Sequence, residues 1–296
     1  MSGPGQPRGA GETGRVVSGL LRGADDTPIA VRAAGDPGAP PIVFVHGWGG
    51  SSAGWSAQFD DRTLTASCRL WAMDLRGHGG SAAPDPAFGG YRDSATWAVD
   101  LAAVVDHAVA EAGGRPSVLV GSSYGGLVIT DLLRERGGTG VAALVLAGAL
   151  TEIGPGRPGG AVGTAMSSRM RELLSEDPAV AVPAVVGFVD ELTATPLDGP
   201  RTQRYVGDLL RVPPSVRLAM FRRTVDNADL LAGLRLPTLV LHGTADTVVA
   251  PSAAEYAAGK IPGAVLRWFS GVGHLPFVER VQEFDAELRA FTGHGR

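Results

Sequence analysis

Cysteine is nearly absent from this sequence, since Cys68 is the only one among 296 residues. A single cysteine excludes a disulfide within the chain and any metal site built from several thiolates. Cys68 stands close to Leu70 and Trp71. We therefore expect its side chain to be buried as a small apolar group.

Long apolar runs and an excess of positive charge are also missing. No segment approaches the roughly 20 apolar residues that a membrane-spanning helix needs. The net charge of −4 and the pI near 5.9 argue against a nucleic-acid-binding surface. Residues 1–15 are rich in Gly and Pro and contain no hydrophobic segment, so we expect a disordered tail and no signal peptide. The prediction is a cytoplasmic protein that binds neither membranes nor nucleic acids.

The pattern that is present is that of a globular α/β protein. Hydrophobic residues make up 44% of the chain and charged residues 19%, as in globular enzymes. Short apolar runs alternate with helical patterns, which predicts a mostly parallel, doubly wound sheet. The expected strands are an antiparallel hairpin of 16–21 and 28–33, followed by 42–45, 70–73, 116–120, 142–146, 239–241 and 265–268. Helices are expected at 97–109, after residue 123, and at 278–291.

The alternation breaks between Gly148 and Leu236. Residues 154–163 are rich in Gly and Pro, which is typical of a hinge or linker. The helical patterns that follow are Met166–Leu174, Pro183–Leu192, Arg201–Leu210 and Val216–Val225. Pro183 suits the first turn of its helix, where its missing N–H costs nothing. We predict a core of residues 16–150 and 216–296 and an inserted helical cap, 151–215, over the carboxyl ends of the strands, where ligands bind.

A G-x-S-x-G pattern at 121–125 lies between an apolar run and a helical pattern. In this context it predicts a sharp turn from strand to helix that presents Ser123 as a nucleophile. Small flanking residues let the backbone bend, and the helix N-terminus favours negative charge beside the serine. Ser122 is the alternative nucleophile, but the turn places it one residue out of line.

A serine hydroxyl needs a base, and the base needs an acid that orients it. His274 follows the last expected strand, so it lies on the same rim of the sheet as Ser123. Asp246 follows the strand before that, which gives the chain order Ser, Asp, His. Glu152 and Asp226 are the alternative acids.

The other histidines are expected to be structural. His46 opens a Gly-rich loop, which it holds by hydrogen bonds, and His78 shapes a turn. His242 ends a strand and is expected to be packed, while His107 and His294 are expected at the surface.

Four motifs carry a family resemblance: HGWGG at 46–50, DLRGHGGS at 74–81, GSSYGG at 121–126, and the pair GTADTVV and GVGHLPF around Asp246 and His274. The chain resembles the α/β-hydrolase superfamily, in its cap-bearing serine esterase, perhydrolase and epoxide-hydrolase-like branch. The resemblance implies an oxyanion hole formed by the backbone N–H groups of Trp48 and Tyr124, with Gly47, Trp48 and Tyr124 contacting substrate. It implies no metal and no organic cofactor.

Two differences from related subfamilies narrow the range of reactions that we expect of this chain. Epoxide hydrolases and haloalkane dehalogenases of similar layout carry aspartate at the elbow, where this chain has Ser123. Hydrolases of C–C bonds commonly have tryptophan after the catalytic histidine, where this chain has Leu275.

The expected function is a serine hydrolase that cleaves a carboxylic ester or lactone of a small, largely apolar substrate through an acyl-enzyme on Ser123. The alternatives are a cofactor-free perhydrolase or haloperoxidase-like enzyme, a C–C bond hydrolase, a biosynthetic cyclase, or a ligand-binding protein on the same fold. The sequence leaves the oligomeric state open.

Overall fold

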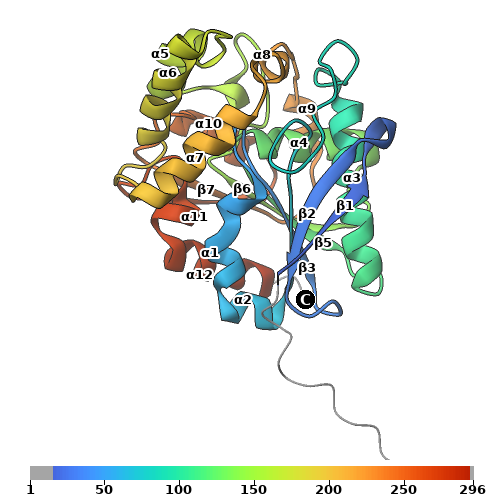
Figure 1. Ribbon diagram of the computed structural model, residues 1–296. Coiled ribbons are helices and arrows are strands. Elements are labelled where there is room, and N and C mark those ends of the chain that lie inside the picture. The colour runs from blue at the N-terminus through green and yellow to red at the C-terminus, as the bar shows by residue number, and fades with distance from the viewer. Residues whose placement is uncertain (1–15, 294–296) are drawn as a thin grey trace, which may run out of the picture.

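A computed structural model describes residues 16–293 of the chain (Figure 1). Residues 1–15, where the sequence predicts a tail, lie outside the described residues. Eight strands form one sheet in the order β1-β2-β4-β3-β5-β6-β7-β8. The strands are β1 (Val17–Arg22), β2 (Pro28–Ala34), β3 (Pro41–Val45), β4 (Arg69–Met73), β5 (Ser117–Ser122), β6 (Val141–Ala147), β7 (Thr238–Gly243) and β8 (Val265–Phe269).

The pairing confirms the predicted α/β sheet. Strand β2 pairs antiparallel with β1 and with β4, while every other pair of neighbours is parallel. Each residue of β3 is buried, because this strand lies inside the sheet and is covered on both faces. That is why its sequence is continuously apolar and does not alternate.

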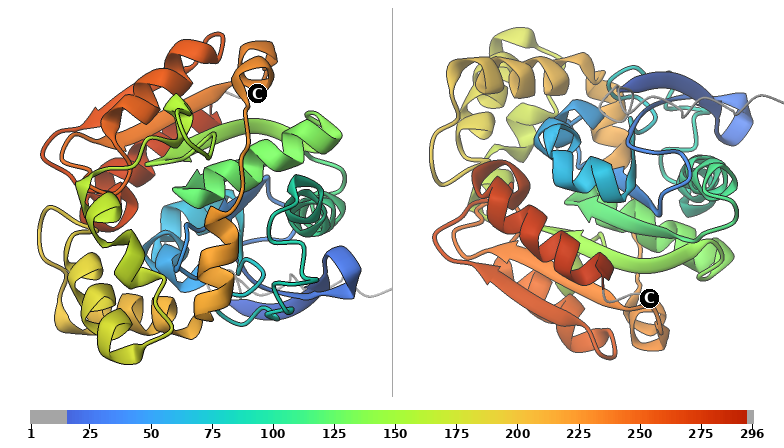
Figure 2. Two further views of the ribbon diagram at one scale, coloured as in Figure 1. Left: turned by 90° about the horizontal axis from the view of Figure 1, so that it is seen from above. Right: turned by 90° about the horizontal axis from the view of Figure 1, so that it is seen from below.

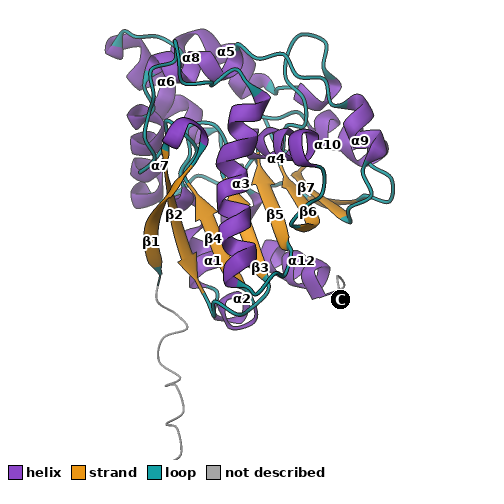
Figure 3. Ribbon diagram, turned by 90° about the vertical axis from the view of Figure 1, so that its right-hand side faces the viewer, coloured by secondary structure: helices purple, strands orange, loops and turns teal. Residues whose placement is uncertain are grey.

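Helices cover both faces of the sheet (Figures 2 and 3). Helix α3 lies on one face, and α1, α2 and α12 lie on the other. Outside the insertion the helices are α1 (Ser56–Asp60), α2 (Arg62–Ser67), α3 (Ser94–Glu111), α4 (Tyr124–Arg136), α9 (Ala228–Gly233), α10 (Pro251–Lys260), α11 (Pro276–Glu279) and α12 (Val281–Gly293). Short 3-10 turns are η1 (Ala24–Asp26), η2 (Ser52–Trp55) and η3 (Pro158–Gly160).

Four helices between β6 and β7 lie above the carboxyl ends of the strands (Figure 1, top). They are α5 (Thr164–Leu173), α6 (Pro178–Asp190), α7 (Gly199–Arg211) and α8 (Pro214–Phe221), and we call them the cap. The boundary expected between residues 215 and 216 falls inside α8.

Two details of the predicted helices are wrong. Pro183 lies inside α6, whose first residue is Pro178, and the Asp177 side chain accepts a hydrogen bond from the N–H of Ala179 at 2.9 Å. The capping aspartate therefore sets the start of the helix. The single terminal helix is broken at Arg280, whose φ of −131° and ψ of 55° are not helical, so α11 and α12 are separate.

A buried carboxyl group joins the last helix to the first. The Gln58 side-chain amide on α1 donates to Asp285 Oδ1 on α12 and to the carbonyl oxygen of Phe277, each at 3.0 Å. Burial raises the pKa of Asp285 from 3.8 to about 6, although the hydrogen bond from Gln58 opposes this shift. The folded protein therefore keeps the proton on this carboxyl group to a higher pH than the unfolded chain does.

Asp285 should make the stability depend on pH. Because its folded pKa is raised, the stability that it contributes is fully present below its unfolded pKa, and it is lost as the pH rises through about 6. Asp285→Asn stays neutral throughout. We expect the difference in free energy of unfolding, variant minus wild type, to increase by about 1–3 kcal/mol when the pH is raised from 4 to 7.5. Urea denaturation at several pH values measures the gap, and a gap independent of pH would contradict the assignment.

Candidate active site

Ser123 occupies a strained turn between β5 and α4. Its φ of 52° and ψ of −123° are unusual for a residue with a side chain. The backbone around it is held by hydrogen bonds: the Ser123 N–H donates to the carbonyl of Ala147 at 3.2 Å, and its carbonyl accepts from Gly126 and Leu150 at 3.0 Å. These bonds fix the conformation that the sequence predicts for a nucleophile elbow.

The glycines of the G-x-S-x-G pattern are required by close contacts. A Cβ on Gly125 would lie 2.3 Å from the carbonyl oxygen of Val45 at the end of β3. A Cβ on Gly121 would lie 2.9 Å from the carbonyl oxygen of Gly125. Since no larger residue fits at either position, the pattern follows from the packing of the turn against the sheet.

His274 and Asp246 meet at the same rim of the sheet. His274 follows β8, Asp246 follows β7, and His274 Nδ1 lies 2.8 Å from Asp246 Oδ2. Asp246 Oδ1 accepts from the backbone N–H groups of Val248 and Val249 at 2.8 and 2.9 Å. Burial acts to raise the pKa of Asp246, but the charge and hydrogen bonds of nearby histidines, His274 first, hold it well below its ordinary range. The carboxylate therefore stays ionised and fixes the imidazole.

The two alternative acids lie in other environments. Glu152 accepts from the backbone N–H groups of Gly159 and Asn227 at 3.0 and 3.1 Å, so it ties the start of the insertion to its end. Asp226 forms an ion pair with Arg157 at the surface. Asp246 is thus the carboxylate that the structure brings to His274.

Asp246 contacts a second histidine, His242. The sequence analysis missed this contact, because it expected the His242 side chain only to be packed in the core. His242 Nε2 lies 3.2 Å from Asp246 Oδ2 and 3.1 Å from the carbonyl oxygen of Val249. Because both neighbours are acceptors, Nε2 carries the proton. The signal in the sequence was its position four residues before Asp246 at the end of a strand.

Two neutral histidines hold the loop after β3. The Leu75 N–H donates to His46 Nε2 at 3.0 Å, and His46 Nδ1 donates to the Gly47 carbonyl at 2.7 Å. The Gly49 N–H donates to His78 Nε2 at 3.2 Å. Burial lowers the pKa of His46, and burial together with His46 lowers the pKa of His78 to about 3. Both expected structural roles are confirmed.

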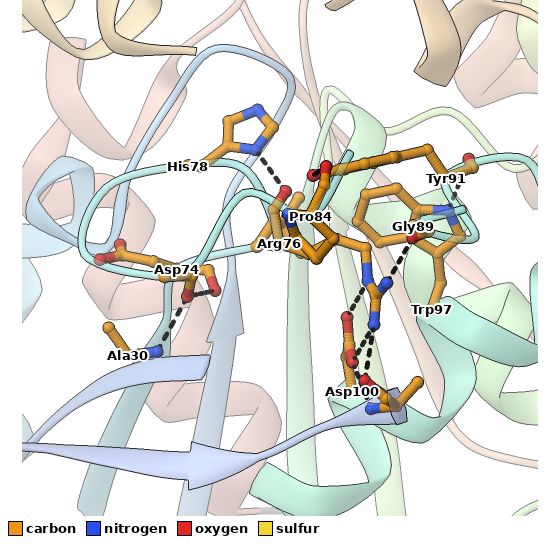
Figure 4. A network of polar contacts seen from close by, with 12 residues as sticks. Ala30, Asp74, Arg76, His78, Pro84, Gly89, Tyr91, Trp97 and Asp100 are labelled. Carbon is orange, nitrogen blue, oxygen red and sulfur yellow. Dashed lines mark hydrogen bonds and ion pairs between the residues drawn. The ribbon is translucent and has the colours of Figure 1, made fainter. Parts of the chain in front are cut away.

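The DLRGHGGS segment is anchored from below by a buried ion pair (Figure 4). Arg76 Nε donates to Asp100 Oδ2 on α3 at 2.6 Å, and both side chains are fully buried. Asp74 accepts from the backbone N–H of Ser52 at 2.6 Å and of Gly80 at 2.8 Å. This segment therefore supports the loop that carries Trp48.

Gly47, Trp48 and Tyr124, which were expected at the oxyanion hole and the substrate site, have different surroundings in the structure. Gly47 faces the serine, since a Cβ on it would lie 2.7 Å from Ser123 Cβ and 3.3 Å from Ser123 Oγ. Trp48 lies edge-on to Phe188 of α6 and Phe221 of α8, at ring-centroid distances of 6.1 and 5.3 Å.

The Tyr124 side chain points away from these residues. It is fully buried, and its hydroxyl donates to the carbonyl of Met220 at 3.2 Å and accepts from Arg223 Nη1 at 3.0 Å. The side chain of Tyr124 thus joins α4 to the end of the cap, and Tyr124 is not among the residues that line the cavity of Ser123.

Ser123 and His274 line one cavity of about 50 Å³. Its wall is mainly apolar and comes from the loops of the core and from the cap. The side chains contributed by the cap and the segment between α6 and α7 are Met166, Phe188, Val189, Leu192, Tyr205 and Leu209. Between residues 16 and 293, no cluster of three or more His, Cys, Asp or Glu side chains is placed to hold a metal ion.

Ser123, at a positive φ, and His274, held by Asp246, line one cavity at the carboxyl edge of a mostly parallel sheet with helices on both faces. This fold is that of an α/β protein. A model of the alpha/beta hydrolase family matches residues 42–287, and the chain belongs to this family. No helix in the described part of the chain combines the length and apolar character needed to cross a membrane.

Several relatives are similar over nearly the whole chain. A solved esterase from Rhodococcus sp. ECU1013 has a TM-score of 0.86 and 42% sequence identity, covering 93% of this chain and 98% of that one. A non-heme haloperoxidase of Rhodococcus erythropolis is 30% identical over 85% of this chain and 91% of its own length. A pimeloyl-[acyl-carrier protein] methyl ester esterase of Aromatoleum aromaticum is 28% identical over 82% and 94%.

The bond between Asp246 and His274 predicts a selective effect of an amide. Asp246→Asn keeps the size but presents an N–H where His274 needs an acceptor, which stabilises the wrong tautomer. A loss of about 10⁴ in kcat is expected with the fold intact. Glu152→Gln serves as the matched control, and p-nitrophenyl acetate hydrolysis with circular dichroism measures both. A folded Asp246→Asn enzyme within tenfold of wild type would refute the role.

The contact between Gly47 and Ser123 predicts that one methyl group disturbs the site. In Gly47→Ala the new Cβ pushes the loop away from the serine, and a misplacement of this kind costs about 100-fold in turnover. Gly207→Ala on α7, with open space around its Cβ position, should keep the wild-type rate. Steady-state kinetics and melting temperatures of both variants test this, and an active Gly47→Ala enzyme would contradict the close approach.

Proposed function

We propose that the protein is a serine hydrolase that cleaves a carboxylic ester or lactone of a small, largely apolar substrate. The observation that carries the proposal is the bond of 2.8 Å between His274 and the ionised Asp246, at the same cavity as the strained Ser123. The esterases among its relatives support the reaction class.

In the proposed first step, Ser123 Oγ attacks the substrate carbonyl carbon while His274 Nε2 takes the hydroxyl proton. Asp246 keeps the histidine proton on Nδ1 and stabilises the imidazolium that forms. The C–O bond to the leaving group then breaks, and His274 gives its proton to the departing alkoxide. The product of this step is an acyl-enzyme on Ser123.

In the second step, water attacks the carbonyl carbon of the acyl-enzyme while His274 takes a proton from the water. The bond to Ser123 Oγ then breaks, His274 returns the proton to this oxygen, and the carboxylic acid is released. The negative charge on the carbonyl oxygen in both steps is bound by the backbone N–H groups of Trp48 and Tyr124. Each donor of this kind contributes about 3 kcal/mol to the stabilisation of the transition state. The reaction needs no cofactor.

The cap supplies the apolar part of the substrate site. Phe188 and Leu209 of the cap line the cavity, and apolar side chains at this place limit the access of water to the reacting atoms. The mainly apolar wall suits an apolar acyl or alcohol group.

A cofactor-free perhydrolase or haloperoxidase-like activity is the second candidate, because a haloperoxidase is among the relatives. It would use the same acyl-enzyme, with hydrogen peroxide in place of water.

Hydrolysis of C–C bonds, cyclisation and ligand binding on the same fold remain alternatives from the sequence. Labelling by a fluorophosphonate probe followed by turnover of p-nitrophenyl esters separates an enzyme from a binding protein. A cytoplasmic location and the lack of a nucleic-acid partner stay predictions.

Ser123 and Ser122 give a sharp test of the nucleophile. Ser123→Ala should fold normally, lose probe labelling and lower turnover about 10⁶-fold, as for one member of a cooperating triad. Ser122→Ala should retain labelling, because the elbow aims residue 123 at the cavity. Labelled-peptide mass spectrometry and ester kinetics measure both variants. A dead Ser122→Ala enzyme beside an active Ser123→Ala enzyme would reverse the assignment.

A further inference from the structure

A buried histidine beside Asp246 has no part in the two steps of the proposed reaction. His242 lies on β7, and its side chain is fully buried. Its ring meets the ring of Trp268 on β8 edge-on, with centroids 5.9 Å apart. His242 does not line the cavity of Ser123, so a molecule bound there does not contact it. Any effect of His242 on the reaction must therefore pass through Asp246.

His242 faces the carboxylate of Asp246 directly. Its Nε2 lies 3.2 Å from Asp246 Oδ2, the same oxygen that His274 Nδ1 approaches to 2.8 Å. The side chains of His242 and Asp246 have no exposed surface, so water does not screen this contact. Burial acts to raise the pKa of Asp246, and it is opposed first by the charge of His274 and then by the hydrogen bond from His242.

A second link between His242 and the carboxylate runs through Val249. The hydrogen on His242 Nε2 donates to the Val249 carbonyl at 3.1 Å, and the Val249 N–H donates to Asp246 Oδ1 at 2.9 Å. On the other side of this loop, the carbonyl of Val248 accepts from the N–H of Gly163, just before α5, at 2.8 Å. His242 thus supports from the core the loop that holds Asp246.

Other neighbours of His274 act on its backbone or are uncharged. Glu279 of α11 is a further ionisable side chain nearby, and it accepts from the backbone N–H of Gly273 at 3.0 Å. The end of β6 contributes Gly148, where a Cβ would lie 3.2 Å from His274 Nδ1. The segment after α6 contributes the carbonyl of Leu192, which accepts from the His274 N–H at 2.9 Å. None of these contacts involves His242, so replacing it leaves them in place.

We propose that His242 is a positioning residue of the proposed triad. Its Nε2–H and its bond to Val249 hold the Asp246 carboxylate in place and take up part of its negative charge. The charge that remains sets the pH below which His274 no longer accepts the serine proton. This inference rests on the proposed function and deepens it, since it assigns a residue that controls the pH range of the same site.

The direction of the effect follows from the charge on the carboxylate. Without the His242 N–H, Asp246 Oδ2 has one donor fewer, so its charge stabilises the imidazolium form of His274 more strongly. The imidazolium then persists to a higher pH. Because only neutral imidazole takes the proton of Ser123, the acid limb of the reaction moves to higher pH.

Two replacements that differ in one donor test the role. His242→Leu removes the N–H and leaves an apolar side chain, while His242→Gln restores a donor, because its amide nitrogen reaches about as far from the backbone as Nε2. We measure the rate at which a fluorophosphonate labels Ser123 between about pH 5 and pH 9. This rate needs an activated serine and no knowledge of the substrate. His107→Leu is the control, because His107 is exposed on α3 and packs against Trp71.

In His242→Leu the midpoint of the acid limb should rise by about half a pH unit or more, because a hydrogen bond to a charged group is lost. His242→Gln and the control should stay within about 0.2 unit of wild type. The KM for p-nitrophenyl acetate should stay within about twofold of wild type in each variant, since residue 242 lies outside the cavity. If circular dichroism shows that His242→Leu does not fold, His242→Asn takes its place. Its shorter amide does not reach the carboxylate, and the same rise is expected.

Two kinds of result would overturn the proposal, and they can be told apart. In the first, the folded variant without the donor has its midpoint within about 0.2 unit of wild type or below it, or His242→Gln shifts as far as His242→Leu. His242 then only fills space, and the hydrolase function stands because wild type is labelled at Ser123. In the second, wild type is not labelled at any pH, so the proposed function itself fails and the role of His242 falls with it.

Discussion

The close approach of two backbones decides the geometry of the whole rim. The turn after β5 passes so near the end of β3 that a Cβ on Gly125 would lie 2.3 Å from the carbonyl oxygen of Val45, and one on Gly47 would lie 2.7 Å from Ser123 Cβ. This contact holds Ser123 at a positive φ and sets the loop of Trp48 beside it. The resulting backbone strain is balanced by three hydrogen bonds of the Ser123 backbone, with Ala147, Gly126 and Leu150.

Much of this arrangement could be predicted because it depends on local chemistry. A buried parallel strand is apolar throughout, so 42–45 was found, and a G-x-S-x-G pattern between a strand and a helix has few other uses. Details that depend on competition between nearby signals were missed. Pro178 and Pro183 both suit a first helical turn, and the capping by Asp177 decides between them.

The site was predicted less completely than the fold. His274 and Asp246 could be placed on one rim by the order of the strands. The contact of His242 with the same carboxylate depends on how the loop after β7 folds back, and its only signal was the position of His242 four residues before Asp246, which strand and helix periodicity does not register.

Trp48 lies edge-on to one aromatic ring from α6 and another from α8. A displacement of either helix would therefore pull on the same short loop whose backbone faces the serine. A molecule with the cap lifted would have a distorted site as well as an open one. The position of the cap helices and the shape of the loop beside the serine are thus mechanically linked.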